Sequence, residues 1–364
     1  MMKKSKIKNK KNILIIFLLL FLICLVSMII VTFYKLSPID SNNEEVIKFT
    51  VESGWGKSKI VSELKQKDLI RSEFFGKLLV KVKNIELYAG TYKLSKDLST
   101  NEILDKISNQ ENIENETVTI TFLEEKTLNY FVQEISKEFP YEEKEIHDKL
   151  SDIDYLEKLI DNYWFITDEI LNKDIYYPLE GYLFPDTYEF KKNSTLEEII
   201  EKILNNLENK LDDYKDDILL GEFTIHEYLT IASITEKEAS FSDDRKTVAG
   251  VIHNRLEKGM TLGMDVTTYY AVQVDVGNTD DKDKVYAALN ECNPYNTRGN
   301  CVKGLPVGPI CNASLSSIVA AIVPEKTEYN YFVADTSKKL YFSKTDSEQA
   351  KVIRELKEKG IWPD

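Results

Sequence analysis

An uninterrupted apolar stretch near the N-terminus, Ile13 to Phe33, limits what this chain can fold into more than any other feature. Its 21 residues include no charged side chain, and a helix of this length crosses the hydrocarbon core of a bilayer. Six lysines and no acidic residue precede it, so the positive-inside rule predicts a cytoplasmic N-terminus. The sequence therefore predicts a basic cytoplasmic tail over 1–12, a single-pass cell-membrane anchor over 13–34, and an extracellular remainder.

Two alternatives to a membrane anchor fit this stretch less well. A cleaved signal peptide has a shorter apolar region, of about 7–15 residues, followed by small residues at a cleavage site. Neither condition holds here. A lipid-modified Cys24 is also disfavoured, because Ile23 stands where a small residue should precede the modified cysteine.

The charge of the chain narrows the classes of partner. The net charge is -14, and because the tail is basic, the residues after it are more acidic still. Nucleic-acid binding is therefore not expected, since it requires a basic surface. A length of 364 residues with 43% hydrophobic side chains is typical of two or three folded domains.

The chain after the anchor divides into a linker over 35–45, a small α/β module over 46–110 and a further α/β segment over 117–172. The module should contain, in order, a strand at 47–51, a helix at 58–67, a second helix after Ser72, a strand at 87–94 and a helix opening at Ser99. The next segment resembles it weakly, with a strand at 117–121, a helix at 127–139 and an acidic helical connector. Residues 173–364 complete an α+β chain with a larger mixed α+β domain.

A capping box at Thr224 and Glu227 predicts a helix that runs to about Ala239. At 100° per residue, Glu236 and Glu238 both fall within a wide apolar arc, where surface glutamates are not normally found. The polar side of this helix is left to His226, Thr230, Ser233 and Lys237.

A carboxyl group at Glu238 would be partly desolvated, which raises its pKa toward the range of a proton donor at neutral pH. The alternative is that the helix ends near Lys237 and leaves Glu238 in solvent, and periodicity does not decide between these two possibilities. Glu236 points to a different side of the helix and should pair with a basic group such as Arg245 or Arg255. If Glu238 is catalytic, it therefore acts either largely alone or with a carboxylate from elsewhere in the chain.

The three cysteines outside the anchor, Cys292, Cys301 and Cys311, lie within twenty residues of one another. They allow one local disulfide in an oxidising compartment and leave one thiol over. A structural zinc site would need four ligands, and neither a paired Cys-x-x-Cys spacing nor a nearby histidine supplies them, so no metal or other cofactor is expected.

From about Val46 onward the sequence resembles the endolytic murein transglycosylases, the MltG or YceG-like family. The landmarks are LEGYLFPDTYEF at 179–190, IASITEKEASF at 231–241, the triplet at 254–256, Asp265 with Thr267, PYNT at 294–297 and GLPVGPI at 304–310. The resemblance places the catalytic glutamate at Glu238. Val266, Ala313, Ser314 and Gln349 depart from the family pattern, and the outer cysteines are not part of it.

The resemblance implies an enzyme that cleaves peptidoglycan glycan strands between N-acetylmuramic acid and N-acetylglucosamine and leaves 1,6-anhydromuramyl ends. It also implies that cleavage near the membrane ends strand elongation, and that peptidoglycan synthases are partners. The 46–110 module looks like the LysM-like glycan-binding part of the family, although Ser53, Gly54 and Trp55 replace the usual turn.

Five further residues are candidates for substrate binding, each with a structural alternative. Tyr295 can stack on a sugar or pack in a turn, and Asn296 can bind an N-acetyl group or hold that turn. Asp186 is either a groove residue or a turn cap, Asp265 is more often a cap, and Arg255 is more often an ion-pair partner than a ligand.

Two other functions stay open. A glycoside hydrolase would use Glu238 with Asp186 or Asp265 across a water molecule. A non-catalytic scaffold would bind the wall through the module and recruit synthesis enzymes through the anchor.

Overall fold

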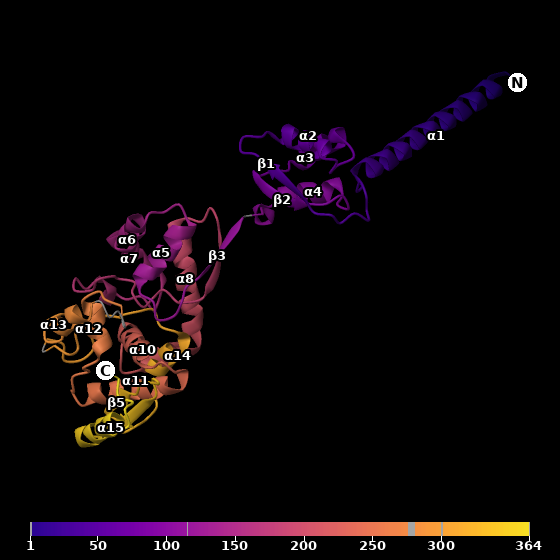
Figure 1. Cartoon of the computed structure of the whole chain (residues 1–364). Helices are drawn as coiled ribbons and strands as arrows, with labels where there is room; N and C mark the ends of the chain where they lie inside the picture. The colour runs from indigo at the N-terminus through magenta and orange to yellow at the C-terminus, as the bar shows by residue number, and fades with distance from the viewer. Residues whose placement is uncertain (1, 115, 276–280, 300, 364) are drawn as a thin grey trace. The chain divides into compact units, whose positions relative to one another are not determined.

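The computed structural model describes residues 2–114, 116–275, 281–299 and 301–363, and it describes side chains from residue 17 onward. The chain forms two compact units, Met1–Glu116 and Thr117–Asp364, which are described separately (Figure 1). The first unit contains α1 (Met2–Leu36), β1 (Ile47–Val51), α2 (Lys57–Gln66), α3 (Glu73–Lys83), β2 (Gly90–Leu94), α4 (Thr100–Ile107) and the 3-10 turn η1 (Gln110–Asn112).

The second unit is larger, and together the two units confirm the predicted mixed α+β class. Its elements are β3 (Thr117–Thr121), α5 (Leu128–Glu138), α6 (Glu143–Leu150), α7 (Ile153–Asn162), η2 (Asp168–Leu171), β4 (Thr187–Lys191), α8 (Leu196–Leu211), η3 (Asp212–Tyr214), α9 (Lys215–Leu220), α10 (Ile225–Glu238), η4 (Ser242–Asp244), α11 (Arg245–Glu257), α12 (Asp265–Ala271), α13 (Lys282–Ala288), α14 (Leu315–Ile322), β5 (Tyr331–Ala334), β6 (Leu340–Ser343) and α15 (Asp346–Glu358).

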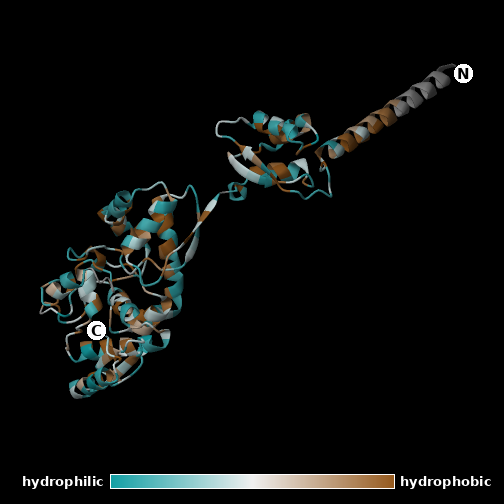
Figure 2. Ribbon diagram, in the orientation of Figure 1, coloured by the Kyte–Doolittle hydropathy of each residue, from teal (hydrophilic) through white to brown (hydrophobic). Residues whose placement is uncertain are grey.

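Helix α1 contains the apolar stretch near the N-terminus. Its segment Phe17–Leu36 has 20 residues and a mean hydropathy of 2.8, which makes it long and apolar enough to cross a membrane. Figure 2 shows this part of α1 as almost continuously hydrophobic, whereas the other helices alternate between hydrophobic and hydrophilic residues. Such helices bury one face against a core, but the segment Phe17–Leu36 of α1 has no polar face to turn toward water.

The small sheet of the first unit pairs β1 with β2 in antiparallel register, with Phe49 opposite Tyr92. Alternate residues of both strands are buried under α2, α3 and α4, as expected for a sheet with one covered face. The return strand begins at Gly90 rather than at residue 87. Gly90 has a φ of +148°, and a Cβ there would lie 2.8 Å from the side chain of Ile113.

In the second unit, β3 pairs with β4 in antiparallel register, with Ile120 opposite Tyr188. Strand β4 lies beyond residue 172, so the expected boundary between residues 172 and 173 does not separate two compact units. The predicted strand and helix at 117–121 and 127–139 are present as β3 and α5. Phe122 and Phe131 stack with ring centres 4.4 Å apart and join the strand to the helix.

The C-terminal part of the second unit is built around α10, which packs against α14, α11 and α12 (Figure 1). Strands β5 and β6 form a separate antiparallel pair, with Phe332 opposite Phe342, and α15 packs on it. The helix that carries Glu238 is therefore surrounded by other elements of this unit.

Candidate active site

Helix α10 begins with the predicted capping box and ends at Glu238. The Thr224 side chain accepts a hydrogen bond from the Glu227 N–H, and the Glu227 carboxylate accepts one from the Thr224 N–H at 2.9 Å. Ala239 then leaves helical geometry, with a φ of -100° and a ψ of 95°. The helix thus ends one residue after Lys237, close to where the alternative placed its end, but Glu238 is its last residue and is partly buried rather than left in solvent.

The predicted polar side of α10 is buried, which the helical pattern did not indicate. His226, Thr230 and Ser233 all lie in the interior. His226 Nε2 donates to the Val307 carbonyl at 3.0 Å, and Ser233 Oγ accepts from the Ile310 N–H at 3.0 Å. The segment over 304–310 has no helix or strand, so its backbone groups need side-chain partners, and His226 and Ser233 provide two of them, whereas Thr230 donates to the His226 carbonyl within α10.

Glu236 is engaged in structural contacts. Its carboxylate accepts from Arg245 at 2.8 Å and from the Ser314 N–H and hydroxyl at 3.0 and 2.6 Å. These bonds fasten α11 and the start of α14 to α10. The predicted pairing with a basic residue is confirmed for Arg245, and Glu236 has little capacity left for chemistry.

Glu238 differs from Glu236 in having a free carboxyl group. Its side chain is partly buried, and no described residue donates a hydrogen bond to it. Burial, with a smaller contribution from the negative charge of Asp265, raises the pKa of Glu238 to about 7. The negative end of the α10 dipole also disfavours a charged carboxylate at this last helical position. Glu238 can therefore hold a proton near neutral pH and offer it to a bound molecule.

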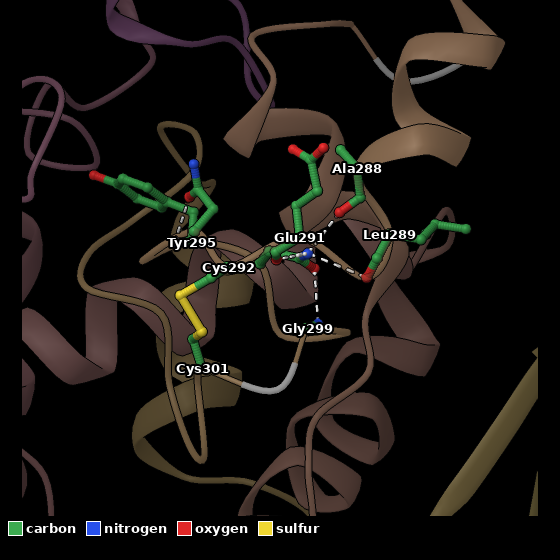
Figure 3. Close-up of a disulfide and its surroundings, with 9 residues drawn as sticks. Ala288, Leu289, Glu291, Cys292, Tyr295, Gly299 and Cys301 are labelled. Atoms are coloured by element: carbon green, nitrogen blue, oxygen red, sulfur yellow. Dashed lines mark hydrogen bonds between the residues drawn. A yellow bond between two sulfur atoms is a disulfide. The ribbon is translucent and has the colours of Figure 1, made fainter.

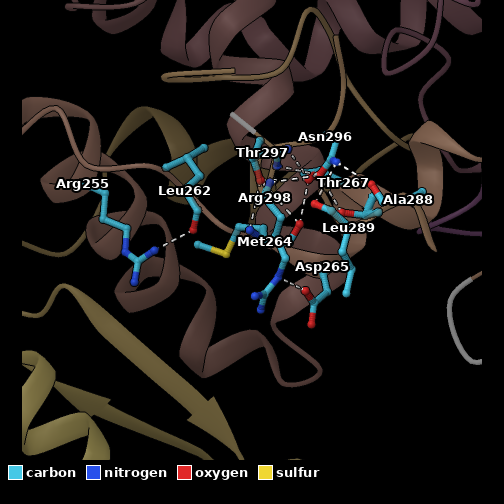
Figure 4. A network of polar contacts seen from close by, with 12 residues as sticks. Arg255, Leu262, Met264, Asp265, Thr267, Ala288, Leu289, Asn296, Thr297 and Arg298 are labelled. Carbon is cyan, nitrogen blue, oxygen red and sulfur yellow. Dashed lines mark hydrogen bonds and ion pairs between the residues drawn. The ribbon is translucent and has the colours of Figure 1, made fainter. Parts of the chain in front are cut away.

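Three charged side chains influence Glu238 electrostatically. Asp265 raises its pKa, while Arg298 and Arg255 lower it. Asp265 is the first residue of α12 and forms an ion pair with Arg298, which lies on the loop after α13 (Figure 4). Sequence reasoning missed Arg298, because its relation to Glu238 depends on a contact between distant segments.

Arg255 supports the backbone rather than pairing with a carboxylate. Its guanidinium donates to the carbonyls of Asn330 and Leu262, both at 2.6 Å, and to that of Thr261 at 3.1 Å. It also lies over the Tyr331 ring, 5.0 Å from its centre. Burial lowers the pKa of Arg255. The expectation of an ion-pair partner is corrected, because carbonyl oxygens occupy the places that a carboxylate would take.

Tyr295 and Asn296 are both buried, contrary to the expectation that they contact substrate. The Tyr295 ring packs against those of Tyr176 and Tyr270, with centres 4.7 and 4.8 Å away, and the latter two rings also stack on each other. The Asn296 amide donates to the carbonyls of Ala288, Leu289 and Glu291, and its oxygen accepts from Thr268, Arg298 and Gly299 (Figure 4). Neither side chain has an open face or a spare polar atom for a sugar.

Asp186 belongs to another part of the second unit. It stands before β4, where its carboxylate accepts from the Thr187 N–H at 2.8 Å and from Asn206 at 3.1 Å. Lys210 lies 3.6 Å away, and these contacts lower the pKa of Asp186. Asp186 thus caps the turn and also lines a groove of about 440 Å³ between β4 and α8, but it is not among the charged groups that influence Glu238.

Cys292 and Cys301 form the local disulfide that the cysteine cluster allowed, and they close the loop that carries Arg298 (Figure 3). Cys311 is the remaining thiol and is buried beside Ser233. Burial raises the pKa of the Cys311 thiol, which keeps it protonated and unreactive.

Glu180 is a second buried carboxyl group, within the LEGYLFPDTYEF segment, and sequence reasoning missed it. Burial raises its pKa to about 7, the same value as that of Glu238. Its oxygens accept from the Leu128 N–H at 2.9 Å and from Tyr270 and Asn312 at 3.1 Å each. A carboxyl group between Leu179 and Tyr182 in an apolar run was the available signal.

A polar cleft of about 520 Å³ opens beside the C-terminal end of α10. Lys237 contributes to it from α10, Tyr270 from α12, and Asn129, Tyr130 and Gln133 from α5. Among the described residues, no group of three or more His, Cys, Asp or Glu side chains is arranged to hold a metal ion. Glu238, which follows Lys237 at the end of α10, is not itself among the residues that line this cleft.

Comparison with known proteins identifies the family to which this chain belongs. The profile of the YceG-like family matches residues 49–355. The endolytic murein transglycosylase of Bacillus subtilis is 35% identical over 87% of this chain and 86% of its own length. That of Streptococcus pneumoniae serotype 2 is 30% identical over 88% of this chain, which covers 60% of the pneumococcal protein. A putative yceG-like protein of Listeria monocytogenes, known from a crystal structure, is 35% identical with a TM-score of 0.59, covering 85% of this chain and 99% of that one. The chain belongs to the YceG-like family.

Proposed function

We propose that this protein is an endolytic lytic transglycosylase that cleaves peptidoglycan glycan strands, with Glu238 as the single general acid and base. One observation carries the proposal. Glu238 combines a pKa of about 7 with a carboxyl group that no described residue engages. Relatives named endolytic murein transglycosylases support the substrate class.

In this mechanism the protonated Glu238 donates its proton to the oxygen that joins C1 of N-acetylmuramic acid to N-acetylglucosamine. The bond between C1 and that oxygen breaks, and the C6 hydroxyl of the same muramic acid closes on C1. Glu238, now a carboxylate, takes the proton from that hydroxyl. The product is a 1,6-anhydromuramyl end, and the acid is ready for another cycle.

An intramolecular nucleophile explains why one carboxyl group is sufficient. The attacking hydroxyl is already held on the sugar, so the reaction benefits from proximity and needs neither a bound water nor a second carboxylate. Glu236 is occupied by Arg245 and Ser314, and Asp186 by Asn206 and Lys210. Asp265 is the remaining candidate for a hydrolytic pair, but its carboxylate is engaged in an ion pair with Arg298.

Lys237 is the neighbour of Glu238 on α10, so a glycan strand that reaches Glu238 is expected to extend into the adjoining polar cleft beside Lys237 and Tyr270. The amides of Asn129 and Gln133 can donate hydrogen bonds to sugar hydroxyls and N-acetyl oxygens there. The first unit would add a LysM-like glycan-binding module. This assignment is supported by its order of strand, two helices and antiparallel strand.

Helix α1 would anchor the enzyme, with residues 1–12 in the cytoplasm and the folded units outside the cell. Cleavage would then take place on nascent strands close to the membrane and terminate their elongation. Peptidoglycan synthases would be partners, since they make those strands at the same surface.

End-group analysis of digested peptidoglycan tests this function. The purified full chain should convert glycan strands into fragments that end in 1,6-anhydromuramic acid, and mass spectrometry distinguishes these from reducing ends, which are heavier by one water. The Glu238→Gln variant should yield neither. Reducing ends alone would establish a hydrolase instead, and unchanged cleavage by Glu238→Gln would remove Glu238 from the mechanism. Glu236→Gln is an unsuitable control because it breaks the contact with Arg245, so Glu138→Gln, exposed on α5, serves as the matched variant.

A further inference from the structure

Helix α3 of the first unit exposes a stripe of large apolar side chains. Phe74, Leu78 and Val82 are 69%, 45% and 74% exposed, respectively. They are spaced four residues apart, so they follow one another along a single side of the helix. We call these three residues the α3 stripe.

The α3 stripe contributes little to the core of its unit. The core side of α3 is formed by Gly76 and Val80, which are buried against residues such as Val61 and Ile70. Single exposed apolar side chains are ordinary on a protein surface, but several in a row mark an interaction site. The partner should therefore be apolar where it meets the stripe.

Positive charge borders the α3 stripe. At 100° per residue, Lys77 and Lys81 project just beside Phe74 on one flank of the stripe. Lys77 pairs with Glu73 at 2.5 Å, whereas Lys81 has no acidic partner among the described residues. An apolar strip with lysines along its edge is typical of a helix that lies in the interface of an anionic membrane.

The start of α3 is fastened to the end of α1. Arg71, two residues before α3, donates to the carbonyls of Pro38 and Ile39 at 2.9 Å each. Its guanidinium also lies 4.9 Å from the centre of the Tyr34 ring, and Tyr34 is in the last turn of α1. Aromatic residues at the end of a membrane-spanning helix sit at headgroup level. Arg71 therefore holds the start of α3 close to the point where α1 leaves the bilayer.

We propose that the α3 stripe inserts into the outer surface of the lipid bilayer, with Lys77 and Lys81 directed at anionic headgroups. This inference rests on the proposed anchoring by α1 and is independent of the catalytic role of Glu238. The first unit then has two attachments to the membrane, the spanning helix and the α3 stripe. Together they restrict the rotation of this unit about the anchor.

Tryptophan quenching in vesicles tests the insertion. The full-length Val82→Trp variant is reconstituted into vesicles of phosphatidylcholine and phosphatidylglycerol with brominated acyl chains, which quench tryptophans that enter the hydrocarbon. Lys83→Trp is the matched control, because residue 83 projects about 180° away from Phe74 on the same helix. The parent protein supplies the background of its own tryptophans.

After subtraction of this background, we expect Val82→Trp to be quenched at least about twofold more than Lys83→Trp, with a blue-shifted emission. Equal quenching of the two variants would overturn the inference. A blue shift without quenching, which grows as the protein-to-lipid ratio increases, would identify a second copy of the chain as the occupant and would also overturn it.

Vesicle flotation distinguishes a failure of this inference from a failure of the proposed anchoring by α1. Protein that fails to float with the vesicles would refute anchoring by α1, and insertion of the stripe with it. Protein that floats without preferential quenching refutes only the stripe. The Glu238→Gln variant carrying Val82→Trp should show the same quenching, because catalysis is not involved.

Discussion

Glu180 and Glu238 are carboxyl groups of the same unit, and burial raises the pKa of each to about 7. Their surroundings differ in one respect. The Glu180 oxygens are occupied by Leu128, Tyr270 and Asn312, whereas no described residue donates to Glu238. A raised pKa is thus not by itself a mark of catalysis, since it also accompanies a carboxyl group that holds segments together. The free hydrogen-bonding capacity of Glu238 is what distinguishes it.

Replacing each of the two glutamates in turn is the most direct test of this difference in role. The Glu238→Gln variant should lose about 10²–10⁴-fold in the rate of anhydro-end formation, the contribution typical of a general acid and base. Its melting temperature should stay close to that of the parent, because no described group loses a partner. A Glu238→Gln protein that is unfolded would contradict the separation of roles, as would one that is fully active.

The opposite result is expected for Glu180→Ala. Removing this carboxyl group leaves the Leu128 N–H and the Tyr270 hydroxyl without this acceptor in the interior, and the Asn312 amide keeps only its bond to the Lys126 carbonyl. The free energy of unfolding should fall by about 3–5 kcal/mol, measured by urea denaturation, with Glu138→Ala as an exposed control. A loss below about 1 kcal/mol would show that Glu180 does not hold these segments together.

The pH dependence of stability sharpens the comparison. A carboxyl group with a folded-state pKa of about 7 and an ordinary value of 4.5 binds its proton more tightly in the folded chain. Its stabilising effect is complete below pH 4.5 and is lost as the pH rises toward 7, by roughly 2–3 kcal/mol for a fully buried group. We expect the free energy of unfolding to decrease over this range in the parent and to change less in Glu180→Gln. Identical slopes would contradict the assignment.

The pH dependence of activity should follow Glu238 instead. The first step needs the protonated acid, so the rate at low substrate concentration should fall as the pH rises through about 7. Asp265 raises the pKa of Glu238, and in Asp265→Asn the descending limb should therefore move to lower pH, by less than about one unit. A shift to higher pH would contradict this expectation. It would show that Asp265 acts mainly by holding the Arg298 guanidinium, which lowers the pKa of Glu238, close to that residue.

The smallest effect is expected at Tyr295. Its ring is packed against Tyr176 and Tyr270, and its hydroxyl accepts from the Tyr176 N–H at 3.3 Å. Tyr295→Phe should cost about 1 kcal/mol of stability and leave KM within about twofold of the parent. A large increase in KM would restore the sugar-stacking role that burial argues against.

The sequence was informative where local rules decide the structure. The capping box at Thr224 sets the start of α10, and a regular helix then determines that Glu236 and Glu238 point to different sides. The strands and helices of the first unit follow from short apolar patterns and from the capping box at Ser99. These features depend on residues within a few positions of one another.

These local rules do not predict contacts between segments that are distant in the sequence. The pairing of Asp265 with Arg298 joins a helix to a loop that has no periodic pattern, and the burial of His226 and Ser233 depends on the irregular segment over 304–310. The antiparallel partner of β3 is likewise distant in the sequence, at β4. Hydrophobic periodicity contains no information about these pairings.

The loop between Cys292 and Cys301 is held in place by its disulfide and also by the hydrogen bonds of Asn296. Asn296 already ties it to the backbone of residues 288, 289 and 291, so the fold of this loop does not depend on the sulfur bridge alone. Chains made in a reducing cytosol should therefore adopt this loop with both thiols free, and air oxidation after purification should close the bridge without refolding. At the extracellular location proposed above, the covalent bond would then protect a chain that opens briefly from proteases.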